Sequence, residues 1–390
     1  MRRALLVLMI CLLPLLSPGW SRSAEVHITP SLTAEEEYSD NYYRSSQNST
    51  SVWATQLTPG INVEAFTDRS RLNVSYTLPY NIIARESGPV DASSDNYLGH
   101  NLTLFAATRP LSRMTVGLAD DFLLTREPGS TDIFNDITSR DLYLRNRVSP
   151  FVGYDIAEKG EVKLSYRNEI LSYLETTPII RDDSTENRGV LTLTYHLNDQ
   201  NHLDMEEQFW RREYTGTNTS YDSFQTMLIF RRELSSWLQA KVGGGYHWRV
   251  FDQSLIPVQD FSLPAFSMSL IGSTDRSKVS ATYEHNAVDF IQNDAYFTAD
   301  QVTLFFQRMF HDVFRGYVGG SYQYSQYEDS PRTDNTWNGY GGVGYSFLNN
   351  MFEVSIEYNR LSRDSNQDGF GYDENRVYLR LSTKYDFPKK

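Results

Sequence analysis

Charged residues recur at every second position in two neighbouring parts of the chain, where they could line a polar pore. Residues 143–149 and 162–167 alternate apolar and polar side chains, and alternate residues of a strand point to the same face. A tight turn at 157–160 would place the two segments side by side. The pattern predicts a basic patch suited to an acidic sugar polymer, formed by Arg145, Arg147, Lys163 and Arg167 together with Glu169.

A simpler interpretation of this patch is that opposite charges on facing strands pair and stabilise the wall. Arg147 and Glu169 lie within one register step of each other in the predicted hairpin, and we favour this interpretation for them. Other inward positions carry both signs of charge. The positive ones are Lys241, Arg249 and Arg380, and the negative ones are Glu64, Glu284, Glu353 and Glu357. A mixed lumen argues against a pore dedicated to phosphate and allows a neutral or weakly charged passenger.

One segment resembles the first half of a calcium-binding loop. Asp364, Asn366 and Asp368 alternate as oxygen ligands would, and Gly369 follows, as in the loop of an EF-hand. The twelfth position is Asn375 where a bidentate Glu is required, and the flanking residues have the alternation of strands. We therefore favour an ordinary hairpin loop over a site for calcium or for cations that bridge lipopolysaccharide.

Catalytic chemistry is not indicated. The seven histidines are scattered without metal-ligand spacing, and no Ser, His and acid group can be placed together on one rim. We predict that the chain is not an enzyme and needs no cofactor.

The first residues predict export. Arg2 and Arg3 precede an apolar run from Ala4 to Leu16, which is too short to cross a membrane as a helix and is typical of a secretory signal peptide. We expect cleavage near residue 24, which leaves residues 25–390 as a single domain without cysteine. Its 33 basic and 49 acidic residues give a net charge of −16, so nucleic acid is not an expected partner.

The remaining sequence predicts membrane-spanning strands. Leu72, Val74 and Tyr76 alternate with polar residues, and similar alternation recurs to the end of the chain. Mean hydropathy is −0.48, as expected when each strand shows only alternate residues to lipid. No part of residues 25–390 approaches the roughly 18 consecutive apolar residues of a membrane helix.

Connections between the strands alternate short and long. Short turns are expected near 68–70, 109–113, 157–160, 198–201, 233–236, 273–276, 310–312 and 348–350. Longer loops are expected near 40–51, 82–95, 125–140, 174–185, 214–221, 250–260, 287–296, 325–335 and 362–374. This alternation predicts an all-β, up-and-down antiparallel transmembrane β-barrel of about 18 strands, of the outer-membrane type, with both termini in the periplasm. The first strand, from about Val26, would pair with the last, from about Arg376, and close the barrel.

Aromatic residues gather near the predicted strand ends. We interpret them as interfacial girdles, with platforms for stacking sugars as the alternative. They are Tyr38, Tyr42, Tyr43, Tyr80, Tyr154, Trp210, Trp237, Trp248 and Trp337.

Three short motifs resemble a known family. They are residues 37–41 (EYSDN), 57–60 (LTPG) and 98–102 (LGHNL), and they are similar to the family described as "putative β-barrel porin", which accompanies exopolysaccharide and exosortase gene sets. The resemblance implies an integral outer-membrane partner of polysaccharide export, and periodicity itself shows none of this. It brings no catalytic residues.

Three functions follow as hypotheses. The first is a conduit or integral partner for exopolysaccharide export across the outer membrane. The second is a general diffusion porin for small solutes. The third is a surface-exposed structural or adhesive barrel, whose role would lie in loops 125–140 and 362–374. The expected partners are outer-membrane lipid, lipopolysaccharide and the barrel-assembly machinery, with periplasmic polysaccharide export proteins under the first hypothesis.

Overall fold

The computed structural model describes residues 24–89, 92–128, 140–175, 182–216, 219–252, 259–290, 295–328 and 330–385. The predicted signal peptide therefore lies outside the described residues, apart from Ala24. Among these residues no helix is long and apolar enough to cross a membrane.

The described residues form one antiparallel sheet. Its first ten strands are β1 (Glu25–Ser39), β2 (Ser51–Phe66), β3 (Ser70–Thr77), β4 (Tyr80–Ser87), β5 (Tyr97–Leu98), β6 (His100–Leu111), β7 (Met114–Thr125), β8 (Tyr143–Ala157), β9 (Gly160–Tyr173) and β10 (Ser184–Asn198). The next are β11 (Asn201–Tyr214), β12 (Tyr221–Ser235), β13 (Leu238–Phe251), β14 (Phe261–Ser273), β15 (Ser277–Phe290), β16 (Ala295–Phe310), β17 (Phe314–Tyr327), β18 (Thr333–Phe347), β19 (Phe352–Ser365) and β20 (Tyr372–Lys384). A short 3-10 helix, Ala92–Asp95, lies between β4 and β5.

Eighteen membrane strands result because two of them are interrupted. β3 and β4 form one strand broken at Pro79, which has no N–H to donate to a ladder. β5 and β6 form the next, broken at Gly99, whose N–H donates to the Pro79 carbonyl over 2.7 Å. A Cβ at Gly99 would lie 2.9 Å from the Leu124 carbonyl oxygen, so the close approach requires glycine. The predicted strand number is confirmed.

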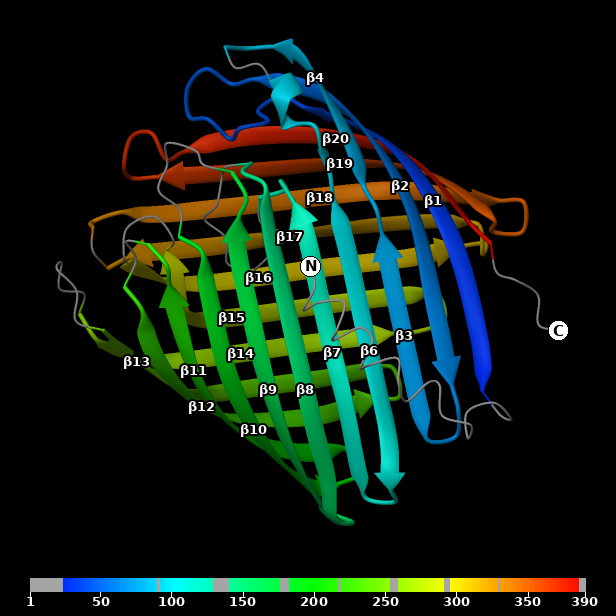
Figure 1. Ribbon diagram of the computed structural model, residues 1–390, viewed down its shortest axis with the longest axis vertical. Helices are drawn as coiled ribbons and strands as arrows, with labels where there is room; N and C mark the ends of the chain where they lie inside the picture. Colours follow the sequence, from blue (N-terminus) through cyan, green and yellow to red (C-terminus); the bar gives the residue numbers. More distant parts are fainter. Residues whose placement is uncertain are drawn as a thin grey trace.

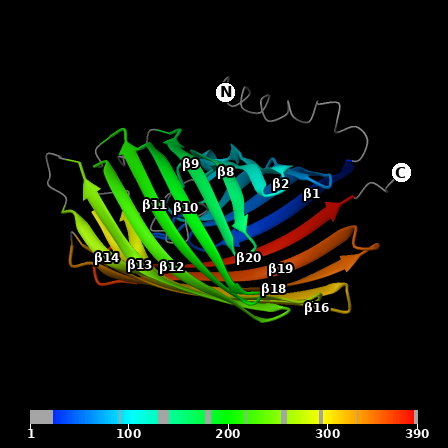
Figure 2. The same ribbon diagram turned by 90° about the horizontal axis from the view of Figure 1, so that it is seen from below.

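The sheet closes on itself. β1 pairs antiparallel with β20 from Ser31 opposite Lys384 to Ser39 opposite Arg376, so the predicted pairing of the first and last strands is confirmed. Figures 1 and 2 show the strands surrounding a common interior, with β1 and β20 side by side. Closure pairs the first and last strands and so removes the continuous unpaired edge that lipid would not tolerate.

Short and long connections alternate as predicted. Eight connections have two to four residues, and nine have four to seventeen. We call the end of the barrel with the short turns, where β1 begins and β20 ends, the turn end, and the opposite end the loop end.

Four loops are markedly shorter than the sequence suggested. Residues 88–96, 291–294, 328–332 and 366–371 connect the strands where loops at 82–95, 287–296, 325–335 and 362–374 were expected. β4 continues to Ser87, and only residues 366–371 separate β19 from β20, so the expected long loop at 362–374 is wrong. The reason is that β18 and β19 remain paired as far as Asp334 opposite Ser365. These strand ends no longer alternate apolar with polar residues, and in sequence they have the composition of a loop.

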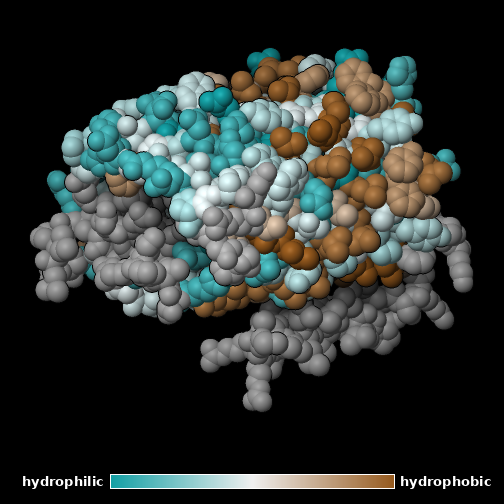
Figure 3. Space-filling model, turned by 90° about the horizontal axis from the view of Figure 1, so that it is seen from above, coloured by the Kyte–Doolittle hydropathy of each residue, from teal (hydrophilic) through white to brown (hydrophobic). Residues whose placement is uncertain are grey.

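The outer face of the barrel is apolar. Large exposed side chains occupy alternate positions, as with Phe224 and Leu228 on β12 or Val302 and Leu304 on β16. Figure 3 shows hydrophobic residues gathered over one part of the surface and hydrophilic residues over another. An apolar band with polar surface beside it is the pattern of a membrane-spanning barrel.

Five outward-facing tyrosines, each hydrogen-bonded to a polar side chain of the next strand, mark the loop-end edge of this band. Each outward tyrosine hydroxyl bonds a polar group on the next strand, two positions nearer the loop end than the residue opposite the tyrosine. The apolar ring then lies in lipid while its hydroxyl reaches the polar boundary. The pairs are Tyr76–His100, Tyr166–Asn187, Tyr283–Asp300, Tyr322–Asn335 and Tyr358–Asn375.

Girdle positions suit some of the predicted aromatic residues and not others. Trp237, Trp248 and Trp337 are exposed on the outer face. Trp210 points inward instead and is only 4% exposed, with its ring 4.9 Å from that of His247. Tyr42 is buried in the loop after β1. Trp210 and Tyr42 are therefore not girdle residues.

The assignment of outer and inner faces can be tested with neighbouring substitutions on β16. Leu304→Arg places a charge in lipid and should lower the free energy of unfolding by roughly 2–4 kcal/mol. Thr303→Arg, one residue away on the inner face, should change it by less than about 1 kcal/mol. Equilibrium denaturation from lipid vesicles measures both, and equal losses would contradict the assignment.

Candidate functional site

Five arginines line the lumen on four consecutive strands in the loop-end half of the barrel. We call this set the arginine wall: Arg145 and Arg147 on β8, Arg167 on β9, Arg188 on β10 and Arg212 on β11. Two glutamates, Glu169 and Glu186, lie among them. Arg188 and Arg212 are not among the lumen residues predicted from the sequence. The alternation of inward and outward positions along β10 and β11 would have predicted both.

Glu186 is the centre of this wall. It is 1% exposed and accepts hydrogen bonds from Arg167 over 2.6 Å, from Arg188 over 2.9 Å and from Arg212 over 2.9 Å. Arg188 also stacks over the Trp210 ring, 4.1 Å from its centroid. A buried carboxylate held by three guanidinium groups is fixed in position.

The two interpretations of the predicted patch are both visible in these contacts. Arg147 forms the expected ion pair with Glu169, and Arg145 pairs with Asp121 over 2.7 Å. Lys163 lies over the Phe151 ring at 4.9 Å. The wall is thus stabilised internally, yet in the loop-end half of these four strands five arginines face only two glutamates.

The wall formed by β19, β20 and β1 carries the opposite excess. Arg380 contacts Glu357 over 3.3 Å and also pairs with Glu35. Nearer the turn end, Glu353 pairs with Arg315 over 2.6 Å. Beyond Glu353 toward the loop end, four glutamates face three arginines on these strands, which leaves an excess of one: Glu35, Glu37, Glu357 and Glu374 against Arg363, Arg376 and Arg380. Because β8–β11 are the sixth to ninth of eighteen strands, the two walls lie nearly opposite each other.

Two side chains from the ends of the connection between β7 and β8 reach the last strand. Arg140, in the loop between β7 and β8, has a side chain only 1% exposed. It donates to Glu127 over 2.8 Å and to the Tyr42 carbonyl over 2.6 Å, and it lies 3.7 Å from Glu374 on β20.

Arg376 of β20 completes this contact, 3.7 Å from Glu127. We call Glu127, Arg140, Glu374 and Arg376 the loop latch. β7 and β8 are the fifth and sixth strands and β20 is the eighteenth, so the latch crosses the interior. No pattern in the sequence predicts the loop latch, because Arg140 follows no strand periodicity.

The charge state of the latch depends on Glu127. Burial would raise the pKa of this carboxyl, but the guanidinium groups of Arg140, Arg376 and Arg44 lower it below its usual value of 4.5. Because the folded-state pKa is depressed, the stabilisation is present above the usual value and is lost as the pH falls through the depressed one. The latch therefore stays ionised at neutral and mildly acidic pH.

The remaining predicted lumen residues lie apart from both walls. Glu64 on β2 accepts from Asn73 over 3.2 Å. Arg249 on β13 donates to Ser223 over 3.0 Å and lies over the Tyr221 ring at 3.8 Å. Lys241 lies nearer the turn end of β13, and Glu284 lies on β15.

The alternative cation site at Asp364, Asn366 and Asp368 remains a prediction, and these three residues have different surroundings. Asn366 is occupied, because its amide oxygen accepts from the Thr333 N–H over 2.8 Å and its amide nitrogen donates to the Pro331 carbonyl over 2.7 Å. Asp364 belongs to β19, and Asp368 is exposed on the loop. Within the described ranges no three His, Cys, Asp or Glu residues are placed to hold a metal ion.

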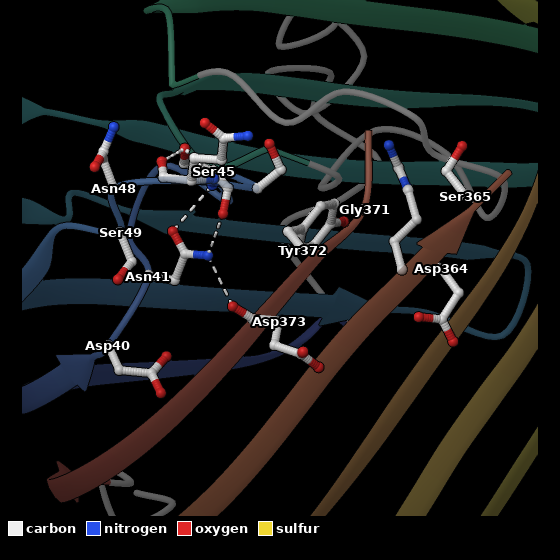
Figure 4. Close-up of a pocket in the computed structure, with 13 residues that line it drawn as sticks. Asp40, Asn41, Ser45, Asn48, Ser49, Asp364, Ser365, Gly371, Tyr372 and Asp373 are labelled. Atoms are coloured by element: carbon white, nitrogen blue, oxygen red, sulfur yellow. Dashed lines mark hydrogen bonds between the residues drawn. The ribbon is translucent and has the colours of Figure 1, made fainter. Parts of the chain in front are cut away.

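A polar cavity lies beside this segment at the loop end (Figure 4). Its volume is about 600 Å³, between the loop after β1 and the ends of β19 and β20. Asn41 joins the two sides by donating to the Ser45 carbonyl over 2.9 Å and to the Asp373 carbonyl over 2.8 Å.

Comparisons with known proteins identify the architecture. Residues 233–385 match the family model described as Putative beta-barrel porin 2; the motifs at 37–41, 57–60 and 98–102 lie outside this range. No curated protein matches the chain by sequence. Three solved structures from Pseudomonas aeruginosa resemble it. OccK2 (OpdF) has a TM-score of 0.51 and 10% identity, over 93% of this chain and 98% of that one.

OccK1 (OpdK) has a TM-score of 0.51 and 8% identity, over 93% of this chain and 99% of that one. OpdK with vanillate has a TM-score of 0.50 and 9% identity, over 92% and 99%. At such identities the likeness shows the fold alone, a closed antiparallel β-barrel. The matching family model describes a porin, which agrees with the expectation that the chain is not an enzyme.

Glu186 provides a test of the arginine wall. Glu186→Gln removes the shared partner of three arginines and should lower the free energy of unfolding by about 3–5 kcal/mol, because the remaining buried charges lose compensation. Glu206→Gln on the adjacent strand, whose carboxylate accepts only from Gln208 among the described residues, is the matched control. A denaturant titration that gave both variants the same stability would contradict the central role of Glu186.

Arg140 provides a test of the loop latch. Arg140→Gln removes the charge that holds the loop to β20, so single-channel conductance in planar bilayers should rise by about twofold as the loop leaves the lumen. Arg113→Gln, in a short turn, should leave conductance unchanged. A latch variant with wild-type conductance would show that the loop does not limit the pore.

Proposed function

We propose that this barrel is a diffusion channel for small polar solutes. The observation that carries the proposal is the charge arrangement of the lumen. An arginine-rich wall on β8–β11 faces a glutamate-rich wall on β19, β20 and β1, and the loop latch crosses the space between them.

Opposite charges on two walls create a field across the pore. Such a field orients a dipolar solute as it passes and disfavours an apolar one, which would have to displace water from charged groups. Because the latch crosses the interior at the loop end, the solutes that fit are small. Carboxylates, phosphates and zwitterions of metabolite size match this description.

Exopolysaccharide export is the second candidate. The arginine wall and the inward Trp210, with Arg188 stacked 4.1 Å from its ring centroid, form a surface on which an acidic sugar could bind by charge and by stacking. The motif resemblance supports the same role. Export of a polymer would require the loop latch to open, whereas passage of small solutes would not.

The proposed orientation follows the bacterial pattern of short periplasmic turns and longer outer loops. The turn end and both termini then lie in the periplasm, and the loop end contacts lipopolysaccharide. In the export role, periplasmic polysaccharide export proteins would meet the turn end.

Ion selectivity tests the proposed channel. The purified protein should conduct in planar bilayers, and Arg147→Glu should lower the chloride-to-potassium permeability ratio about twofold or more, because it reverses a charge on the arginine wall. Arg232→Glu makes the same change on the outer face of β12 and is the control. A purified barrel that conducts no ions would overturn the proposal.

Export is tested by gene deletion. Surface polysaccharide should fall in a deletion strain whose other export genes are intact and unduplicated, and a plasmid copy should restore it. Normal polysaccharide together with slower uptake of small anions would favour the diffusion channel.

A further inference from the structure

Four basic side chains form a row across the lumen wall near the turn end, apart from the arginine wall. They are His196 on β10, His202 on β11, Arg231 on β12 and Lys241 on β13. Each lies directly opposite the next in the strand register. We call them the basic row. Neighbouring strands are about 4.8 Å apart, so the row spans roughly 15 Å.

The row faces the interior. Arg231 contacts Asp204 over 3.2 Å, and Asp204 accepts from Thr194 over 2.7 Å, which joins three strands on their inner face. The residues beside the row on β12 and β13, Phe230 and Val242, are exposed on the outer face. All four basic residues are half-buried.

Arg231 and Lys241 are incompletely compensated. Like charges directly opposite each other destabilise a sheet, and these two cations are in register. In the described ranges no acidic side chain forms an ion pair with Lys241, and the buried Nε of Arg231 has no hydrogen-bond acceptor. Arg167 and Arg212 also have a buried Nε without an acceptor, but each of them forms an ion pair with Glu186. The missing ion pair of Lys241 is the feature that distinguishes the basic row.

The two histidines extend the same surface. Their Nδ1 atoms are 2.6 Å apart and the rings meet edge to face at 4.8 Å, so one ring donates a proton to the other. Each imidazole keeps its Nε2 for another partner. The sequence showed these residues only as scattered histidines, since the strand register that joins them is not visible in spacing.

Three carboxylates lie on the same part of the wall as the basic row. Their own contacts show whether they neutralise its cations. Asp204 is held by Arg231 and Thr194. Glu233 on β12 accepts from Gln239 over 2.5 Å. Glu161 on β9 leans toward β8, where a Cβ at Gly153 would lie 3.5 Å from its Oε1. None of the three pairs with Lys241.

We propose that the basic row is a binding site for an oxyanion, a phosphate or carboxylate group of a solute in the lumen. An oxyanion between Arg231 and Lys241 would accept from the guanidinium and ammonium groups and would remove the repulsion between them. This inference rests on the proposed channel function. It gives that channel a second binding site for anions, on the turn-end side of the arginine wall.

Lys241→Gln tests the site by removing one of the two cations. In planar bilayers, millimolar inorganic phosphate added on the turn-end side should reduce the chloride current of the wild type, and Lys241→Gln should weaken this block about fivefold or more. Lys241→Arg should restore it. The control is Lys278→Gln, which removes an inward lysine of β15 outside the row. Phosphate should reduce its current as much as that of the wild type.

Acetate in place of phosphate separates the two ligand chemistries. A block by both anions identifies a general oxyanion site, and a block by phosphate alone narrows the site to phosphate groups.

A binding measurement separates this site from the channel function. Broadening of the phosphorus-31 resonance of inorganic phosphate should occur with the detergent-solubilised wild type and Lys278→Gln, and should be lost with Lys241→Gln. Binding without ion conduction would refute the channel and retain the site. Conduction with equal block and equal broadening in Lys241→Gln and Lys278→Gln would refute the site and retain the channel.

Discussion

Lipid provides no partner for a backbone N–H or C=O group, and this constraint determines most of the structure. A sheet in hydrocarbon must pair every strand on both sides, so the first and last strands have to meet. The pairing of β1 with β20 meets that requirement. The interruptions at Pro79 and Gly99 occur in strands β3–β4 and β5–β6, where the Gly99 N–H and Pro79 carbonyl bond to each other.

Closure fixes what each side chain can do, because strand residues alternate between lipid and lumen. The outer alternation is committed to apolar contact with the membrane, and its boundary is marked by tyrosines whose hydroxyl groups bond Asn, Asp or His on the next strand. The inner alternation is free to carry charge. Charges there are partly buried and need partners, which explains why ion pairs such as Arg145–Asp121 and Arg315–Glu353 connect neighbouring strands.

The sequence predicted the features that depend on local periodicity. Eighteen strands, the alternation of short and long connections and the inward parity of Arg145 and Arg167 all follow from a period of two. The extent of loop 362–374 was wrong, since polar strand ends resemble loops once the apolar alternation stops. Trp210 was placed in a girdle because its distance from a strand end suggested an interface, while its parity, shared with Arg212, pointed to the lumen.

Contacts between distant segments could not be predicted. Arg140 lies in a loop without periodicity, and its approach to Glu374 depends on how the closed barrel brings the loop beside the last strand. The register that aligns His196, His202, Arg231 and Lys241 depends on three consecutive turns, and a slip of one residue in any of them would point a strand's side chains to the other face. Spacing in the sequence carries no record of either arrangement.

The two halves of the lumen differ in how their cations are compensated, and this difference bears on solute passage. At the arginine wall a passing anion competes with Glu169 and Glu186, which are already bonded to the same guanidinium groups. Because breaking a buried ion pair is costly, the anion gains less there than the number of arginines suggests. Lys241 has no such competitor among the described residues, so an anion near it displaces only water. A channel arranged in this way would use the arginine wall to orient solutes and the less compensated turn-end half to hold them.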